Sequence, residues 1–158
     1  ITVLDTSWTS QFQELKIPVL KISDNPEIEE DEPAIGYDGL IHSREPVSLE
    51  TCLRLIEILL ENYGSDVLIT QWINNTEIFI IPMLNPDGWD YVCEDWDQNK
   101  MWYKNQHDND TNGYFHPSID GVNLNRNFDS NWEYGNPNPS SPRYRGAYPF
   151  SEKESMIK

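Results

Sequence analysis

Gly39–Pro46, which reads GLIHSREP, lies where a strand-like pattern gives way to a helix-like pattern. Upstream, the apolar run Ala34–Ile41 predicts a strand that ends at His42. Downstream, Pro46 suits the first turn of a helix because its fixed φ fits that position. The polar residues between them are therefore predicted at a strand-to-helix junction.

The predicted helix carries a broad apolar stripe. Its members follow the spacing of one helix face: Leu49, Cys52, Leu53, Ile56, Leu59 and Leu60. Ser48 or Glu50 suits the N-terminal end, and Gly64 is placed to adopt the left-handed conformation just after the helix. Ser65 is expected to cap a second, short helix that runs to about Asn74.

Two further strands are predicted around these helices. Ile17–Ser23 reads as a short strand, and Glu77–Leu84 as a buried one that ends in the turn sequence NPDG at 85–88. The order strand, helix, helix, strand predicts an α/β layer structure with crossover connections. The rest of the chain is predicted to be mostly irregular, with short helices at Gly88–Cys93 and Ser151–Lys158.

Length and charge exclude several classes of function. The 158 residues suit one domain, and 27 acidic against 11 basic side chains give a net charge of −16. This charge argues against partners such as nucleic acid or an anionic membrane surface, which need clustered Lys and Arg. No apolar run approaches the roughly 18 residues of a membrane span. Cys52 and Cys93 permit at most one disulfide and are predicted to be buried free thiols.

His42 and Glu45 form the first candidate site. An imidazole and a carboxylate three residues apart can chelate one divalent ion where the backbone turns both toward the same point. Catalytic zinc takes three protein ligands and keeps an open position for water, so a third ligand must come from elsewhere. The alternative is a surface histidine beside a glutamate that caps the helix.

Asn125 and Arg126 form the second candidate site, within residues 121–128 (GVNLNRNF). An amide beside a guanidinium can bind a carboxylate through charge-assisted, bidentate hydrogen bonds. The alternative is a structural arginine in a loop.

Taken together, these segments resemble the zinc carboxypeptidases of the carboxypeptidase A and carboxypeptidase T type. The resemblance runs from about Ile17 to the end and implies an α/β fold with a mixed central sheet and flanking helices, present only in part. The segments that carry it occur in the family's order: 39–45 (GLIHSRE), 85–88 (NPDG), 100–105 (KMWYKN), 121–128 (GVNLNRNF) and 144–152 (YRGAYPFSE).

The resemblance implies a zinc-dependent enzyme that hydrolyses the C-terminal peptide bond of peptides or proteins. By this resemblance His42 and Glu45 are zinc ligands, Arg44 helps to bind the peptide, and Asn125 and Arg126 hold its free C-terminal carboxylate. Family resemblance also implies a secreted or extracellular protein, although no signal peptide precedes Ile1 in this sequence.

Two departures from the family pattern qualify this expectation. Tyr103 stands at the position of the oxyanion-stabilising arginine, and the side chain of the adjacent Lys104 is expected to point elsewhere. The third zinc ligand and the general-base glutamate lie further along in the family, at positions that neither His107 nor His116 matches. Residues 1–158 are thus expected to be the first part of a catalytic domain, inactive without the remaining half. The alternative is a carboxypeptidase-like domain that binds peptide C-termini or metal without turnover.

A third candidate site lies in residues 106–120, a predicted calcium-binding loop insertion. It opens like an EF-hand loop, with oxygen ligands at alternate positions and Gly113 at the sharp turn. The predicted ligands are Asp108, Asp110, Asn112, Tyr114 and Asp120. The alternative is a polar surface turn; on this loop alone, a calcium-dependent extracellular interaction module is the third functional hypothesis.

Overall fold

The computed structural model describes residues 2–5 and 8–157. Four strands form one sheet: β1 (Thr2–Asp5), β2 (Val19–Ile22), β3 (Ala34–Asp38) and β4 (Glu77–Ile81). Four α-helices accompany it: α1 (Pro46–Asn62), α2 (Val67–Ile73), α3 (Pro86–Glu94) and α4 (Trp96–Asn99). Three short 3₁₀ turns complete the secondary structure, at Leu124–Arg126, Trp132–Tyr134 and Glu154–Met156.

The sheet is mixed, with the strand order β1-β2-β4-β3. β3 and β4 are parallel, with Ile35 opposite Ile78, and α1 and α2 form the crossover between them. β2 is antiparallel to β4, with Leu20 opposite Ile80. The predicted α/β class and crossover are confirmed, whereas the sequence analysis did not anticipate β1.

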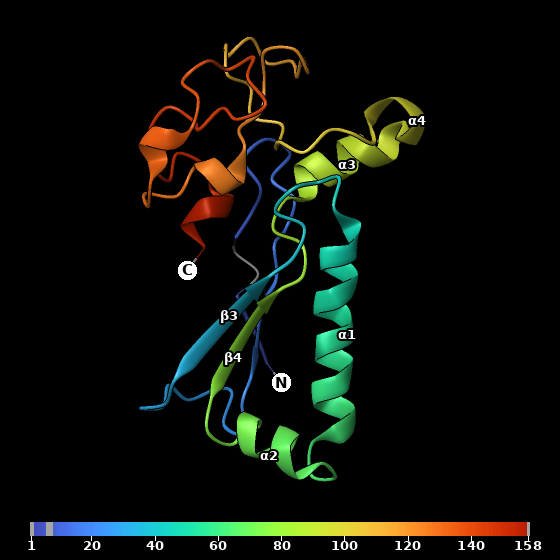
Figure 1. Ribbon diagram of the computed structural model, residues 1–158, viewed down its shortest axis with the longest axis vertical. Coiled ribbons are helices and arrows are strands. Elements are labelled where there is room, and N and C mark those ends of the chain that lie inside the picture. The colour runs from blue at the N-terminus through green and yellow to red at the C-terminus, as the bar shows by residue number, and fades with distance from the viewer. Residues whose placement is uncertain (1, 6–7, 158) are drawn as a thin grey trace.

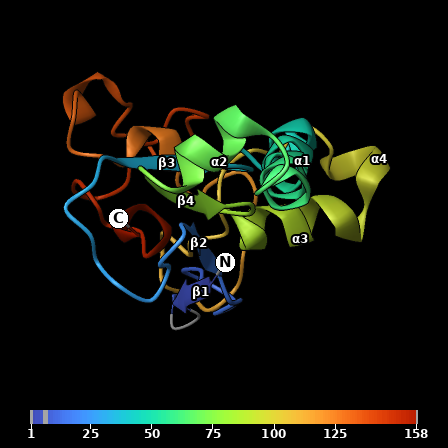
Figure 2. The same ribbon diagram turned by 90° about the horizontal axis from the view of Figure 1, so that it is seen from below.

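Helix α1 runs alongside the parallel strands, and the irregular second half of the chain gathers where those strands end (Figure 1). The view from below shows the four strands side by side, with α1 beside β3 and β4 (Figure 2). Since α1 begins near the carboxyl end of β3, the residues between them meet the irregular half of the chain at that end of the sheet.

Apolar side chains pack into two clusters. The first lies between the sheet and helices α1 and α2 and contains Ile22, Cys52, Leu59, Ile73, Ile78 and Ile80. The second contains Ile17, Val19, Leu84 and Ile157, so the end of the described chain packs against the strand region near its start. Burial of this apolar surface is the main stabilising contribution to the fold.

The apolar stripe of α1 is narrower than predicted. Cys52 and Leu59 are buried, but Leu53 and Leu60 are 41 % and 44 % exposed. Ile56 packs against the core as predicted, and Leu55, which lies outside the predicted stripe, does so as well. The prediction was wrong at Leu53 and Leu60 because the sheet covers only one side of the helix.

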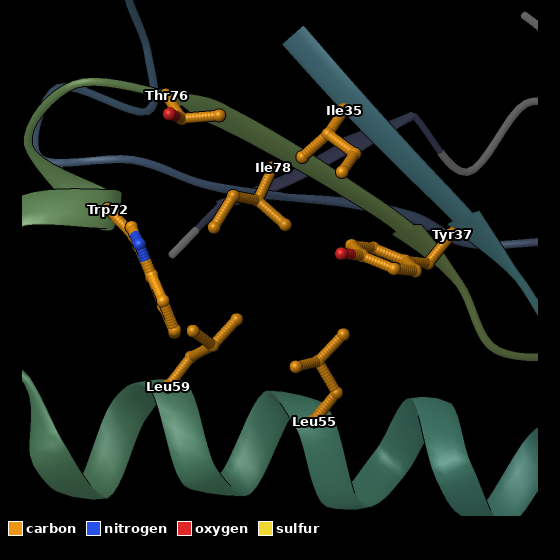
Figure 3. A pocket seen from close by; sticks show the side chains of 7 residues that line it. All are labelled: Ile35, Tyr37, Leu55, Leu59, Trp72, Thr76 and Ile78. Atoms are coloured by element: carbon orange, nitrogen blue, oxygen red, sulfur yellow. The ribbon is translucent and has the colours of Figure 1, made fainter. Parts of the chain in front are cut away.

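An apolar groove of about 280 Å³ remains between α1 and the strands. Leu55 and Leu59 line it from the helix, and Ile35 and Tyr37 from β3 (Figure 3). All five residues of β3 are exposed, and the strand lies last in the sheet order. Within the part of the chain that the structure describes, nothing pairs with its outer edge.

Several predicted boundaries also need correction. β3 ends at Asp38 rather than beside His42, because the chain turns at Leu40, whose φ of 53° is left-handed. β4 stops at Ile81. The NPDG sequence at 85–88 is the start of α3 rather than a free turn, since the side chain of Asn85 accepts a hydrogen bond from the Gly88 amide.

Helix ends and cysteines show a similar mixture of outcomes. Gly64 has the predicted left-handed φ, 79°, but Asp66 rather than Ser65 caps α2. Both cysteines are free; Cys52 is buried as predicted, whereas Cys93 is exposed. None of the helices in the described ranges is long and apolar enough to cross a membrane.

Gly39 joins β3 to the candidate site, and its replacement by alanine is expected to destabilise the fold. A Cβ there would lie 2.5 Å from the Pro82 carbonyl oxygen and 2.9 Å from that of Ser48. Both neighbours are backbone atoms that cannot turn aside, so a loss of about 1–3 kcal/mol is expected in urea unfolding. Gly36→Ala is the matched control, because nothing lies within 4 Å of its Cβ. Equal losses in the two variants would contradict the prediction.

Candidate functional site

The strand-to-helix junction brings His42 and Glu45 together. His42 Nδ1 lies 3.2 Å from Glu45 Oε2. Glu45 is the N-cap residue of α1, but its side chain makes no capping hydrogen bond. The alternative was a histidine beside a glutamate that caps the helix. It is wrong in one respect, because the Glu45 side chain does not cap α1. The two atoms lie at a separation that two ligands of one small ion can adopt.

Asn123 contacts the second ring nitrogen of His42, a role that was not predicted from the sequence. His42 Nε2 lies 3.3 Å from Asn123 Oδ1, and Asn123 Nδ2 donates to the Pro142 carbonyl at 3.1 Å. Because the amide nitrogen is engaged, Oδ1 faces the imidazole and can accept a hydrogen bond from a protonated Nε2. In that tautomer Nδ1 turns its lone pair toward Glu45, the arrangement that metal-binding histidines usually have.

Tyr103 packs between His42 and Arg44. Its ring lies edge-on to the imidazole, with centroids 5.7 Å apart, and the Arg44 guanidinium lies 4.4 Å from its ring centroid. Burial raises the pKa of the Tyr103 phenol, against the opposing charges of Arg44, Arg126 and Arg143. The phenol is therefore neutral near pH 7 and can donate a hydrogen bond without carrying a charge.

Lys104 does not replace the missing arginine. Its side chain is buried and its Nζ donates to the Pro139 carbonyl at 2.9 Å. Burial lowers the pKa of Lys104 to about 8, although the charge of Asp120 opposes this. The expectation that Lys104 points elsewhere is confirmed.

Asn125 and Arg126 lie in the 3₁₀ turn that follows Asn123. Arg126 is half-buried, and its Nη1 donates to the Asn125 carbonyl at 2.6 Å. Its buried Nε has no hydrogen-bond partner. A structural arginine normally has such donors satisfied, and the described residues do not account for this one.

Two buried asparagines hold these segments in place, and the sequence analysis assigned neither of them a role. Asn105 accepts from the Val122 amide at 2.7 Å and donates to Glu152 Oε2 at 2.8 Å. Asn127 donates to the carbonyl of Arg145 at 2.9 Å. For Asn127 the alternation of Asn at 123, 125 and 127 was the available signal, because an amide can donate to one backbone group and accept from another.

The remaining histidines have other partners. His107 Nδ1 lies 2.8 Å from Glu152 Oε2, and His116 Nδ1 contacts the hydroxyl of Ser118 at 2.9 Å. Among the described residues, no third His, Cys, Asp or Glu joins His42 and Glu45 in a group that could hold a metal ion.

A buried acidic cluster underlies the loop that carries Tyr103. Burial, followed by the charge of Glu152, raises the pKa of Glu154 to about 8. Burial alone would lower the pKa of His107, but the hydrogen bond and charge of Glu152 outweigh it and raise this pKa. The backbone amide of Gln11 donates to Glu154 Oε1 at 3.1 Å, which ties the N-terminal region to this cluster.

This cluster predicts that stability falls as pH rises. Folded Glu154 keeps its proton up to about pH 8, whereas in the unfolded chain it titrates near 4.5. Between these values the folded state binds more protons, so the free energy of unfolding decreases by up to about 1.4 kcal/mol per pH unit. The raised pKa of His107 acts in the same direction above its ordinary value.

Glu154→Gln should flatten this dependence and stabilise the fold near pH 8, as measured by urea unfolding at about pH 5.5 and about pH 8. Glu50→Gln, an exposed position on α1, is the control. An unchanged slope in the Glu154 variant would contradict the prediction.

The predicted calcium loop brings three of its carboxylates together. Single oxygens of Asp108, Asp110 and Asp120 lie within 4.8 Å of one another. Backbone amides already occupy several of these oxygens: Gly113 donates to Asp108 at 2.6 Å and His116 donates to Asp120 at 2.7 Å. These bonds account for the loop conformation without an ion, so calcium binding stays a prediction.

Comparison with known proteins identifies relatives over most of the chain. The family model described as zinc carboxypeptidase matches residues 6–157. The match begins before Ile17, earlier than the sequence analysis expected. Mouse carboxypeptidase A2 is 38 % identical over 149 residues, which cover 92 % of this chain and 32 % of the relative. A yeast protein named inactive metallocarboxypeptidase ECM14 is 30 % identical over 145 residues, which cover 91 % of this chain and 32 % of the relative.

Solved structures agree with this result. The carboxypeptidase A of Helicoverpa armigera superposes with a TM-score of 0.80 at 30 % identity, covering 98 % of this chain and 35 % of that one. The chain therefore spans about one third of the length of the curated relatives that it matches.

Proposed function

The chain belongs to the zinc carboxypeptidase family, and from this premise we propose that the complete protein is a zinc-dependent metallocarboxypeptidase. It would hydrolyse the C-terminal peptide bond of peptides or proteins. The observation that carries the proposal is the paired placement of His42 Nδ1 and Glu45 Oε2, 3.2 Å apart, with Nε2 of the same imidazole held by Asn123.

The donor set fits zinc. His42 and Glu45 would hold the ion, and Asn123 would keep the imidazole in the tautomer that a ligand needs. When bound, zinc in such a site polarises a carbonyl and lowers the pKa of a bound water. We further propose that residues 1–158 are part of a catalytic domain whose other part supplies the third ligand and the general base.

Arg126, Asn125 and Arg44 would bind the substrate. Arg126 has an unpaired Nε in a turn beside Asn123, and a guanidinium can donate two hydrogen bonds to a C-terminal carboxylate. Recognition of a free carboxylate would restrict cleavage to the last peptide bond. Arg44 would bind the peptide chain nearer His42, while its guanidinium stays over Tyr103.

Tyr103 supports a second candidate, a carboxypeptidase-like domain that binds peptide C-termini or metal without turnover. The neutral phenol offers a hydrogen bond to a developing oxyanion but no positive charge. One similar yeast protein is itself named inactive. Secretion, as in the family resemblance, and calcium binding by the loop at 106–120 remain further proposals.

Hydrolysis of a blocked dipeptide by the complete natural protein tests both candidates. We expect activity that disappears after chelation and returns with zinc but not with calcium. Activity that persists without metal would overturn the zinc proposal. Metal-dependent binding of the peptide with no hydrolysis would favour the second candidate.

A further inference from the structure

A polar pocket of about 280 Å³ opens beside the 3₁₀ turn Leu124–Arg126. Two arginines, Arg126 and Arg143, line it together with the amide of Asn125. Its other lining residues are neutral: Phe128, Ser130, Asn131 and Tyr134. The pocket thus holds two positive charges and no carboxylate.

Neither guanidinium is neutralised within the described ranges. The ion pairs found there involve other residues. In the part of the chain that the structure describes, Arg126 Nη1 donates to the Asn125 carbonyl at 2.6 Å, its buried Nε has no partner, and Arg143 donates to the Tyr134 carbonyl at 3.5 Å. The partners found for the two guanidinium groups are therefore neutral carbonyls, which leave both positive charges uncompensated.

Two neighbouring arginines without a carboxylate partner are unusual in a chain that is so rich in acidic residues. The chain carries 27 acidic and 11 basic side chains, so an arginine would readily find a carboxylate if the pocket served only stability. One arginine is enough to bind the main-chain carboxylate of a peptide, so the presence of a second arginine in the pocket requires another explanation.

On the basis of the proposed function, we propose that this pocket selects peptides whose C-terminal residue is acidic. Arg126 would bind the main-chain carboxylate, and Arg143 the side-chain carboxylate of a terminal Glu or Asp. The planar guanidinium suits both, because its paired donors match the two oxygens of a carboxylate. Arg143 is then a residue that determines specificity rather than a catalytic one.

Calorimetric binding to the complete, metal-stripped protein tests this proposal without turnover. The probes are three blocked tripeptides, which end in Glu, in Gln and in Glu with an amidated main-chain carboxylate. We expect the Glu peptide to bind about tenfold more tightly than the Gln peptide, as one charge-assisted hydrogen bond provides. Arg143→Gln should abolish this ratio, and Arg143→Lys should retain part of it.

Arg54→Gln is the matched control, since Arg54 is exposed on α1 and pairs with Glu57; it should leave the ratio unchanged. Equal binding of the Glu and Gln peptides, or a preference that survives in Arg143→Gln, would overturn this inference. If the amidated peptide bound as well as the free one, the proposed function itself would fail. The two failures are therefore distinguishable.

Discussion

Replacement of His42 by alanine is expected to remove zinc from the complete protein and to lower kcat/KM by about 10³-fold or more. The expectation follows from the several kcal/mol of transition-state stabilisation that a catalytic metal provides, at about 1.4 kcal/mol per factor of ten. His42 is the only imidazole that the described residues place beside Glu45. Zinc content per chain by atomic emission measures the loss independently of activity.

Matched variants separate loss of the metal from loss of the fold. Glu45→Gln keeps the size of the side chain and should also lower zinc content, because a neutral amide binds zinc less strongly than a carboxylate. His116→Ala is the control histidine, since its ring contacts Ser118 within its own loop. Full zinc content in His42→Ala, with an unchanged circular dichroism spectrum, would remove His42 from the proposed ligand set.

Replacement of Asn123 by leucine is expected to weaken zinc binding less than replacement of His42 does. Loss of the bond to His42 Nε2 should reduce zinc affinity by about 10–100-fold, whereas His42→Ala removes the ligand itself. The zinc site would thus depend on Asn123, which binds no metal itself and acts by orienting the His42 ring.

Sequence reasoning worked where local pattern and packing agree. The strand, helix, helix, strand order was readable because β3, α1 and β4 each carry a regular apolar period. Burial was predicted wrongly at Leu53 and Leu60 of α1, since periodicity does not tell how much of a helix surface the neighbouring layer covers. The apolar run at Ala34–Ile41 likewise indicated a strand but not its exposure: all five residues of β3 are exposed.

The candidate site was only partly predictable for a related reason. His42, Glu45, Asn125 and Arg126 lie in short motifs whose chemistry is recognisable along the chain. Asn123 was missed because its contact with His42 joins residues far apart in sequence. Arg143 was missed because its pocket forms only when the loop after residue 134 returns to the Asn125 turn. Contacts of this kind follow from the tertiary fold rather than from spacing.

Replacement of Tyr103 by arginine is expected to raise kcat of the complete protein by about 10²–10³-fold, with little change in KM. This is the usual size of one oxyanion-stabilising group. Tyr103 already lies beside the His42 ring, but its neutral phenol carries no positive charge. An arginine at this place would add the positive charge that the developing oxyanion lacks.

The neighbourhood of Tyr103 makes the outcome informative in both directions. Arg44 lies 4.4 Å from the Tyr103 ring centroid, and a second guanidinium would replace this favourable contact with repulsion between like charges. Tyr103→Phe keeps the ring but removes the hydroxyl, and it should lower kcat if the phenol donates to the oxyanion. Tyr63→Arg adds the same charge at the end of α1, where Tyr63 contacts Asn74, and should change nothing. An unchanged or lower kcat in Tyr103→Arg, together with a loss in Tyr103→Phe, would show that the phenol is adapted to its role and that Arg44 requires a ring beneath it.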